Sequence, residues 1–119
     1  MYIQLEYMKL VLEPDPDMAG WLYKWSEAPS FDWDKGNLRK LKKHGLIRSQ
    51  VEELAEDFVF AGRIARPDLK ESRWELIGTD RNGDCLAMTF TIRNGRLRPI
   101  SCRPAHTMEK TVYREVKFL

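Results

Sequence analysis

Arginine is concentrated near the end of the chain, in the stretch FTIRNGRLRPISCRPA at residues 90–105. Within it, Asn94-Gly95 separates two apolar runs. Asn-Gly is the strongest short-range signal for a β-hairpin, because a type I′ turn needs positive φ at both central residues. Guanidinium groups bind phosphate oxygens through two parallel hydrogen bonds. We therefore expect the arginines of these two paired strands to form a surface that faces phosphate groups. They are Arg93, Arg96, Arg98 and Arg103.

Strand alternation divides these arginines between the two faces of the expected sheet. Counting by twos places Arg96 and Arg98 on the side of Cys102, and Arg103 on the side of Leu97. Basic groups are thus expected on both faces, with at least one of them beside the core.

Charge is segregated along the chain, although the net charge is only +2. Two stretches are mainly acidic: residues 1–34 hold two basic and seven acidic groups, and residues 49–92 hold five basic and nine acidic groups. The other two are mainly basic: residues 35–48 hold six basic groups and no acidic group, and residues 93–119 hold seven basic and two acidic groups. Two basic islands between acidic stretches suit a protein that binds a polyanion on one surface. A solvated charge pattern without a function is the alternative.

The elements that must position these groups follow from capping signals and periodicity. Helices are expected to begin at Asp15-Pro16, at Asp34 and at Ser49, where Ser49-Gln50-Val51-Glu52 has the form of a capping box. The second of these helices should end at His44, with Gly45 as the left-handed residue after it. Strands are then expected over residues 58–65, 73–79, 84–93 and 96–103, and a last helix over residues 107–118.

This order of elements predicts an α+β fold: N-terminal helices, a four-stranded antiparallel meander and a C-terminal helix. At 119 residues the chain is expected to have one core. It shows no secretory signal and no run of about 18 apolar residues, so we expect a cytoplasmic protein without a membrane segment. Cys85 and Cys102 lack the spacing of metal ligands or of a CxxC motif, so both are predicted to be reduced packing thiols.

Five separated motifs occur in one order, and together they resemble the BrnT family. They are FDWDKGN at 31–37, KKHG at 42–45, VEELAEDFVF at 51–60, ESRWELIG at 71–78, and TIRNGRLRPISCRPA at 91–105 followed by Glu109 and Tyr113. The resemblance covers roughly residues 31–116. Residues 1–30 have no counterpart in the family pattern, so we expect an N-terminal extension of a strand over residues 2–12 and a short helix, before a toxin domain at residues 31–119.

The BrnT family comprises ribonuclease toxins of type II toxin–antitoxin pairs. The resemblance implies a compact RelE-like ribonuclease fold and an endoribonuclease that cleaves RNA and arrests translation. It also implies a ribbon-helix-helix antitoxin, similar to BrnA, that neutralises the toxin. Operator DNA would then be bound only through the antitoxin.

The chemistry implied for such a site needs no metal and no cofactor, because RNA carries its own nucleophile in the 2′-OH. His44 is the candidate acid or base, since its unperturbed pKa of about 6.5 lies near neutrality. A position at a helix C-terminus favours its charged form and hence the acid role. The alternative is that His44 only caps the helix before Gly45.

The remaining site residues follow from charge and from position. We expect the catalytic group to be His44, Arg73, Arg93 and Arg103, and the RNA-binding group to be Lys35, Lys42, Lys43 and Arg98. Glu71, Glu109 and Tyr113 are further candidates for proton transfer. Two other functions stay open at this point: a catalytically inactive RNA- or protein-binding domain on the same scaffold, and a DNA-binding co-repressor that acts only with its antitoxin.

Overall fold

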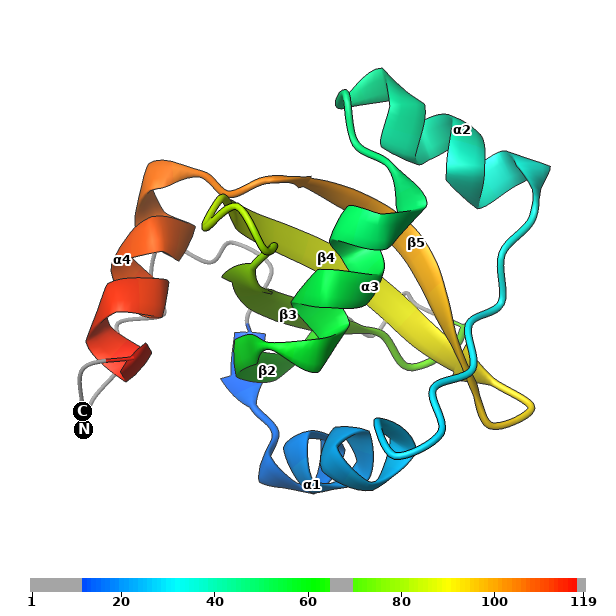
Figure 1. Cartoon of the computed structure of the whole chain (residues 1–119). Helices are drawn as coiled ribbons and strands as arrows, with labels where there is room; N and C mark the ends of the chain where they lie inside the picture. Colours follow the sequence, from blue (N-terminus) through cyan, green and yellow to red (C-terminus); the bar gives the residue numbers. More distant parts are fainter. Residues whose placement is uncertain (1–11, 65–69, 118–119) are drawn as a thin grey trace.

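The computed structural model describes residues 12–64 and 70–117, which form a five-stranded sheet and four helices (Figure 1). Each strand pairs antiparallel with the next one in the chain, so the sheet order is β1-β2-β3-β4-β5. The predicted α+β class is confirmed. The elements are β1 (Leu12–Pro14), α1 (Pro16–Trp25), α2 (Lys35–Lys43), α3 (Arg48–Glu56), β2 (Phe58–Ile64), β3 (Trp74–Thr79), β4 (Cys85–Arg93), β5 (Arg96–Pro104) and α4 (Thr107–Lys117).

The described sheet has one strand more than the predicted meander. The added strand is β1, in which Glu13 lies opposite Arg63 of β2. Nearly all of the strand expected over residues 2–12 lies outside the described residues. The RelE-like character of the fold and the separate extension over residues 1–30 stay predictions.

Local capping signals set the ends of α1 and α2 as expected. The Asp15 carboxylate accepts a hydrogen bond from the Met18 N–H at 3.0 Å, and the Asp34 carboxylate accepts one from the Asn37 N–H at 3.0 Å. After α2, Gly45 has φ of +70°. Only a residue without a Cβ takes that conformation without strain, so this glycine ends the helix.

The predicted start of α3 is wrong by one or two residues. The helix begins at Arg48, so Ser49 lies inside its first turn rather than before it. The Gln50 side-chain oxygen reaches back and accepts a hydrogen bond from the Ile47 N–H at 2.9 Å. Gln50 thus has the role at Ile47 that Glu52 was expected to have at Ser49.

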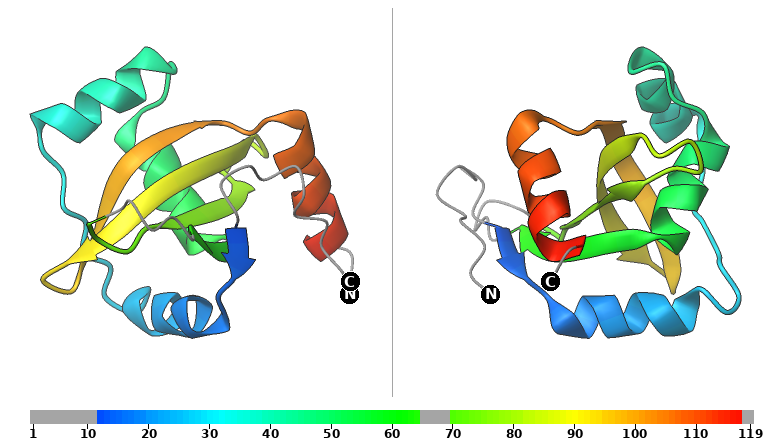
Figure 2. Two further views of the ribbon diagram at one scale, coloured as in Figure 1. Left: turned by 180° about the vertical axis from the view of Figure 1, so that it is seen from behind. Right: turned by 60° about the vertical axis from the view of Figure 1, so that its left-hand side comes forward.

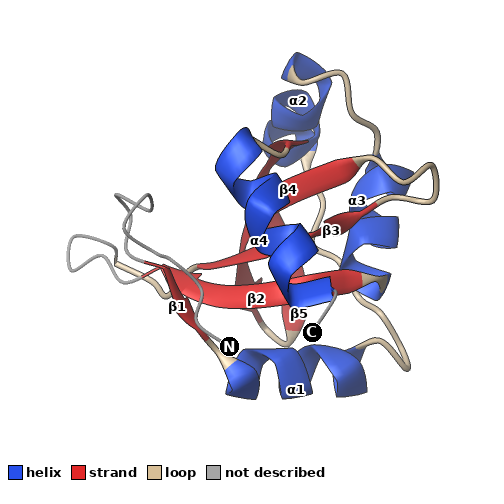
Figure 3. Ribbon diagram, turned by 90° about the vertical axis from the view of Figure 1, so that its left-hand side faces the viewer, coloured by secondary structure: helices blue, strands red, loops and turns tan. Residues whose placement is uncertain are grey.

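Helices cover the two faces of the sheet unequally. On one face, α1 and α3 bury Leu22 and Leu54 against Leu76, and these side chains belong to the main hydrophobic cluster. On the other face, α4 buries Val112 against Ile77 in a smaller cluster, so α3 and α4 lie on opposite sides of the sheet (Figure 3). None of the helices in residues 12–64 and 70–117 is long and apolar enough to cross a membrane.

Helix α2 stands at the edge of the sheet beside β5, away from α4 (Figure 1). Only one side of it is buried, through Asn37 and Leu41. The cysteines behave as packing residues: Cys102 is fully buried in the main cluster, where burial raises the pKa of its thiol to about 12.

Candidate nucleic-acid interface

A β-bulge in β5 decides where its arginines point. Pro99 and Ser101 lie opposite consecutive residues of β4, so Ile100 is an extra residue without a partner. A bulge of this kind switches the side to which the following side chains point. Arg98 and Arg103 therefore share one face of the sheet. The prediction that they lie on opposite faces is wrong, because counting by twos assumes an unbroken strand.

The two other arginines expected in the site lie on this same face. Arg93 alternates with Thr91, which is the cross-strand partner of Arg98. Arg73 directly precedes Trp74, whose ring packs into the main cluster on the opposite side. In the view from behind, α4 and α2 stand at the two ends of this face, and no described helix crosses its middle (Figure 2).

Between α2 and this face of the sheet runs a groove of about 410 Å³. Its lining combines cationic side chains from one helix and from three separate strand ends. Three arginines come from the sheet side and three cations come from α2. The lining residues are Gly36, Asn37, Arg39, Lys40, Lys43, Glu71, Arg73, Arg93, Arg98, Pro99 and Ile100.

Helical spacing explains which cations of α2 line the groove. Lys43 lies four positions after Arg39 and three after Lys40, so all three share one side of the helix. Asn37 and Leu41 hold the buried side against the sheet. Lys42 is exposed and does not line the groove.

The segment before α2 fixes Arg98 from both sides. The Asp32 N–H donates to the Leu97 carbonyl at 2.9 Å, and the Asn37 side-chain amide donates to the Pro99 carbonyl at 3.0 Å. These bonds also cover part of the outer edge of β5, which would otherwise expose unpaired backbone groups. The Arg98 guanidinium then meets the Asp34 carboxylate at 2.7 Å and the Asp32 carboxylate at 3.5 Å.

These contacts perturb both partners of the Arg98 pair. Hydrogen bonds from the Asn37 backbone and from Arg98 hold the pKa of Asp34 below its usual value. The hydrogen bond to Asp34 raises the pKa of Arg98. Both groups are therefore charged near neutrality, and the motif FDWDKGN serves to aim one guanidinium into the groove.

Glu71 pairs with the two other sheet arginines of the groove. Its Oε1 lies 3.2 Å from Nη2 of Arg93 and 3.9 Å from Nη2 of Arg73. The Arg73 Nε is buried and has no hydrogen-bond partner among residues 12–64 and 70–117. A buried donor without an acceptor costs free energy.

Arg103 belongs to a different, more buried cluster at the start of α4. Its guanidinium donates to both oxygens of Glu109, at 2.6 and 2.8 Å, and the His106 N–H donates to the same carboxylate at 2.8 Å. Burial would raise the pKa of Glu109, but the hydrogen bonds from Arg103 and with Glu75 outweigh it and lower the pKa to about 2. This pair fastens α4 to β5.

Glu75 completes that cluster as a buried acid. Glu75 is 6% exposed, and its Oε1 has no hydrogen-bond partner within the described part of the chain. Burial, followed by the hydrogen bond with Glu109 and the charge of Glu109, raises the pKa of Glu75 to about 8. Near neutrality the proton therefore resides on Glu75, while Glu109 stays ionised beside Arg103.

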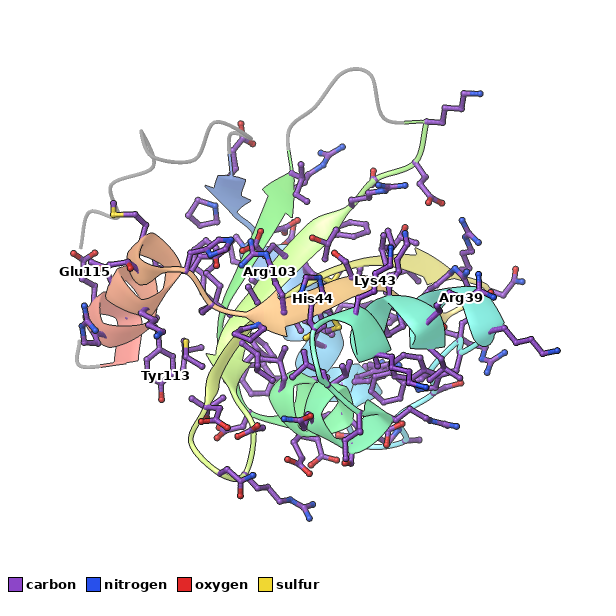
Figure 4. All side chains as sticks on the ribbon, turned by 90° about the horizontal axis from the view of Figure 1, so that it is seen from above. Arg39, Lys43, His44, Arg103, Tyr113 and Glu115 are labelled. Atoms are coloured by element: carbon purple, nitrogen blue, oxygen red, sulfur yellow. The ribbon has the colours of Figure 1, made fainter. Side chains whose placement is uncertain are left out.

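His44 lies at the end of α2 and is exposed. Its backbone N–H donates to the Leu41 carbonyl at 3.0 Å, and its side chain is not among those that line the groove. In the view from above, His44 follows Lys43 along α2, and Arg103 lies beyond it toward α4 (Figure 4). Tyr113 is half-buried against the smaller cluster under α4.

The structure thus brings only part of the expected site together. The predicted residues that line the groove are Lys43, Glu71, Arg73, Arg93 and Arg98. Those that do not are Lys35, Lys42, His44, Arg103, Glu109 and Tyr113. The sequence analysis missed Arg39 and Lys40. The three- and four-residue spacing from Gly36 to Lys43 would have indicated that both lie on the same side of the helix as Lys43.

The groove is suited to binding anions whose charge is spread over several oxygens. Guanidinium groups match phosphate oxygens, and lysine ammonium groups add strong positive charge. In the described part of the chain, no group of three or more histidine, cysteine, aspartate or glutamate side chains could hold a metal ion.

A model of one protein family matches residues 33–109 of the chain, and its description is the ribonuclease toxin BrnT of type II toxin–antitoxin systems. The match contains every residue that lines the groove. No curated protein matches the chain. Since the family model covers more than half of the sequence, this chain belongs to the BrnT family of ribonuclease toxins of type II toxin–antitoxin systems.

Proposed function

We propose that this chain is an endoribonuclease that binds RNA phosphates in the groove and cleaves the backbone by attack of the 2′-OH. The observation that supports the proposal most strongly is the convergence of Arg73, Arg93 and Arg98 with the cations of α2 in one groove. The 2′-OH supplies the nucleophile, so the chain needs to supply charge stabilisation and proton transfer. This mechanism requires no metal ion.

Charge stabilisation is the main contribution of the arginines. Negative charge gathers on the phosphate as the 2′-oxygen adds to it, and preorganised cations stabilise that charge more than the ground state. Arg98 is the most firmly held of the three, because its two neighbours in β5 are both bonded to residues 30–37.

Proton transfer needs one group that accepts a proton and one that donates a proton. We assign the proton-accepting role to Glu71, the carboxylate that lines the groove, and the proton-donating role to His44, which follows Lys43 in sequence. A hydroxyl proton passes to the carboxylate as the 2′-oxygen attacks. The imidazolium then gives a proton to the departing 5′-oxygen.

The experiment that tests this function is cleavage of a defined RNA by purified protein in the presence of a chelator. We expect a 2′,3′-cyclic phosphate at the product end, and no cleavage at a position whose 2′-OH is replaced by hydrogen. Cleavage that continues at a 2′-deoxy position would reject attack by the 2′-OH. Activity that disappears with the chelator and returns with a metal ion would reject the metal-independent mechanism.

A binding domain without catalysis is the second candidate function. The exposed position of His44 outside the groove lining favours it, because the best candidate acid is not among the lining residues. In that case the protein would bind RNA with the same salt dependence but leave it intact. The cleavage experiment separates these two candidates directly.

Membership in the family implies an antitoxin partner and an RNA substrate. We propose further that the antitoxin is a ribbon-helix-helix protein, that operator DNA is bound only through it, and that the toxin arrests translation in the cytoplasm. Induced expression should stop growth and protein synthesis, and co-expression of the antitoxin should restore both. Continued growth with abundant, folded toxin would contradict the toxin role.

A further inference from the structure

All three sheet arginines that line the groove are already paired with carboxylates. Arg73 and Arg93 share Glu71, and Arg98 meets Asp34 and Asp32. The α2 cations of the groove have no carboxylate partner among the described residues. The groove therefore has two kinds of cation, and only one kind is free to attract RNA without giving up another contact.

The geometry of Glu71 resembles that of a bound phosphate. Both of its oxygens accept from Nη2 of Arg93, at 3.2 and 3.4 Å, and Arg73 approaches Oε1 from a second strand. A carboxylate and a phosphodiester each present two oxygens that share one negative charge. Both fit the same guanidinium donors.

Exposure separates these pairs from a permanent structural pair. The difference lies in the carboxylates: the side chains of Glu71 and Asp34 are 32% and 49% exposed, whereas Glu109, the partner of Arg103, is 7% exposed. The arginines do not differ in this way, since Arg98 is 18% exposed and Arg103 is 31% exposed. Exposed ion pairs stabilise a protein by only about 0 to 1 kcal/mol, so an incoming anion can replace them at small cost. Arg103 stays bound to Glu109, while Arg73, Arg93 and Arg98 can exchange partners.

We propose that Glu71 and Asp34 occupy two phosphate-binding positions in the free groove, and that RNA binds by displacing them from the arginines. This inference rests on the proposed function, since it takes the groove to be the RNA site. The two carboxylates then lower the affinity for weakly bound polyanions. Displacement also frees Glu71 beside the bound phosphate.

The test measures binding apart from cleavage, with a short single-stranded oligodeoxynucleotide that lacks the 2′-OH. Glu71→Gln keeps the size of the side chain and removes its charge. We expect the variant to bind about two- to fivefold more tightly than the wild type near neutral pH, as removal of a weak competing ion pair predicts. Unchanged or weaker binding by a folded Glu71→Gln variant would overturn the inference.

Salt dependence gives a readout that a purely structural role of Glu71 would not change. In the wild type, the Glu71 carboxylate still neutralises part of the charge of Arg73 and Arg93 after displacement, so the bound phosphate releases fewer of the cations condensed on the oligonucleotide. In the variant this carboxylate charge is absent, so the slope of log affinity against log salt should steepen by up to about 0.7. An unchanged slope would contradict displacement.

Glu115→Gln is the matched control, because Glu115 is an exposed glutamate on α4, far from Arg39 and Lys43 in the view from above (Figure 4). It makes the same change in net charge and should leave affinity and slope unchanged. If it tightened binding as much as Glu71→Gln, the effect would come from total charge, and the inference would fail.

Asp34→Asn repeats the test at Arg98. Asparagine caps a helix as well as aspartate does, so α2 should keep its N-terminus. We expect tighter oligodeoxynucleotide binding here also. Failure of the proposed function would appear differently, as wild-type protein that binds the oligonucleotide but does not cleave RNA.

Discussion

The buried carboxyl group of Glu75 makes the folding stability depend on pH, and both the sign and the size of this dependence follow from its surroundings. Its pKa is about 8 in the folded protein, against 4.5 for an unperturbed glutamate, so the folded state holds the proton more tightly than the unfolded state. The wild type therefore loses stability as the pH rises from about 4.5 to about 8, by about 1.4 kcal/mol for each pH unit. The cost is about 3 kcal/mol at neutral pH and approaches roughly 5 kcal/mol above pH 8.

Glu75→Gln should remove this cost. Glutamine is uncharged at all of these pH values, and its amide can donate to the Glu109 carboxylate as the protonated acid does. The variant should match the wild type at about pH 4.5 and exceed its free energy of unfolding by about 3 kcal/mol at about pH 7. Urea denaturation followed by tryptophan fluorescence at several pH values measures the difference.

The control is Glu109→Gln at the neighbouring carboxyl. It leaves the half-buried Arg103 without a charged partner, so it should destabilise the protein by about 2 to 4 kcal/mol. The two neutralising changes should thus have opposite signs near neutral pH. A Glu75→Gln variant that is less stable than the wild type at every pH, or whose advantage does not grow with pH, would show that Glu75 is ionised in the native state.

Three further predictions concern the packing of the helices against the sheet and one cation of the groove. Asn37→Ala loses the hydrogen bonds that the side chain donates to the Asp32 and Pro99 carbonyls and the one that it accepts from the Asp34 N–H. Urea denaturation should therefore show a free energy of unfolding lower by about 2 to 3 kcal/mol. A loss below about 0.5 kcal/mol would contradict the role of Asn37 in holding α2 to β5. Gly78→Ala would place a Cβ 2.8 Å from the Asp57 carbonyl oxygen and 2.8 Å from the Phe58 Cα. Thermal denaturation should therefore show a free energy of unfolding lower by about 1 to 3 kcal/mol. Unchanged stability would mean that α3 and β2 can shift to make room for the methyl group. Lys43→Gln should weaken oligonucleotide binding and reduce the salt slope by about 0.7, while Lys110→Gln on α4 serves as the control that should do neither.

Short-range signals in the sequence were sufficient for most element boundaries. Asp15 and Asp34 cap their helices, and Asn94-Gly95 turns the hairpin with φ of +53° and +73°. Each of these signals acts within a few residues, so it can be recognised without knowledge of the rest of the fold. The pairing of β1 with β2 was not recognisable, because it depends on a partner about fifty positions away.

The candidate site was harder to predict, because it depends on register and on distant pairing. The extra residue Ile100 reverses the strand alternation, and nothing in the local sequence marks it as a bulge. The pairing of Arg103 with Glu109 likewise depends on how α4 docks, so the sequence could not show that this arginine is engaged elsewhere. Arg73, Arg93 and Arg98 could be expected to lie close together because their strands are neighbours in the meander, and all three line the groove.

Single-turnover cleavage of one RNA by arginine variants tests the proposed site most directly. Arg73→Gln, Arg93→Gln and Arg98→Gln should each lower the cleavage rate by about tenfold to a hundredfold, since each removes a preorganised cation from the groove. Arg81→Gln, in the exposed turn between β3 and β4 and outside the groove, should cleave at the wild-type rate. Wild-type rates in all three groove variants, or an equal loss in Arg81→Gln, would contradict the assignment of this groove as the site of RNA cleavage.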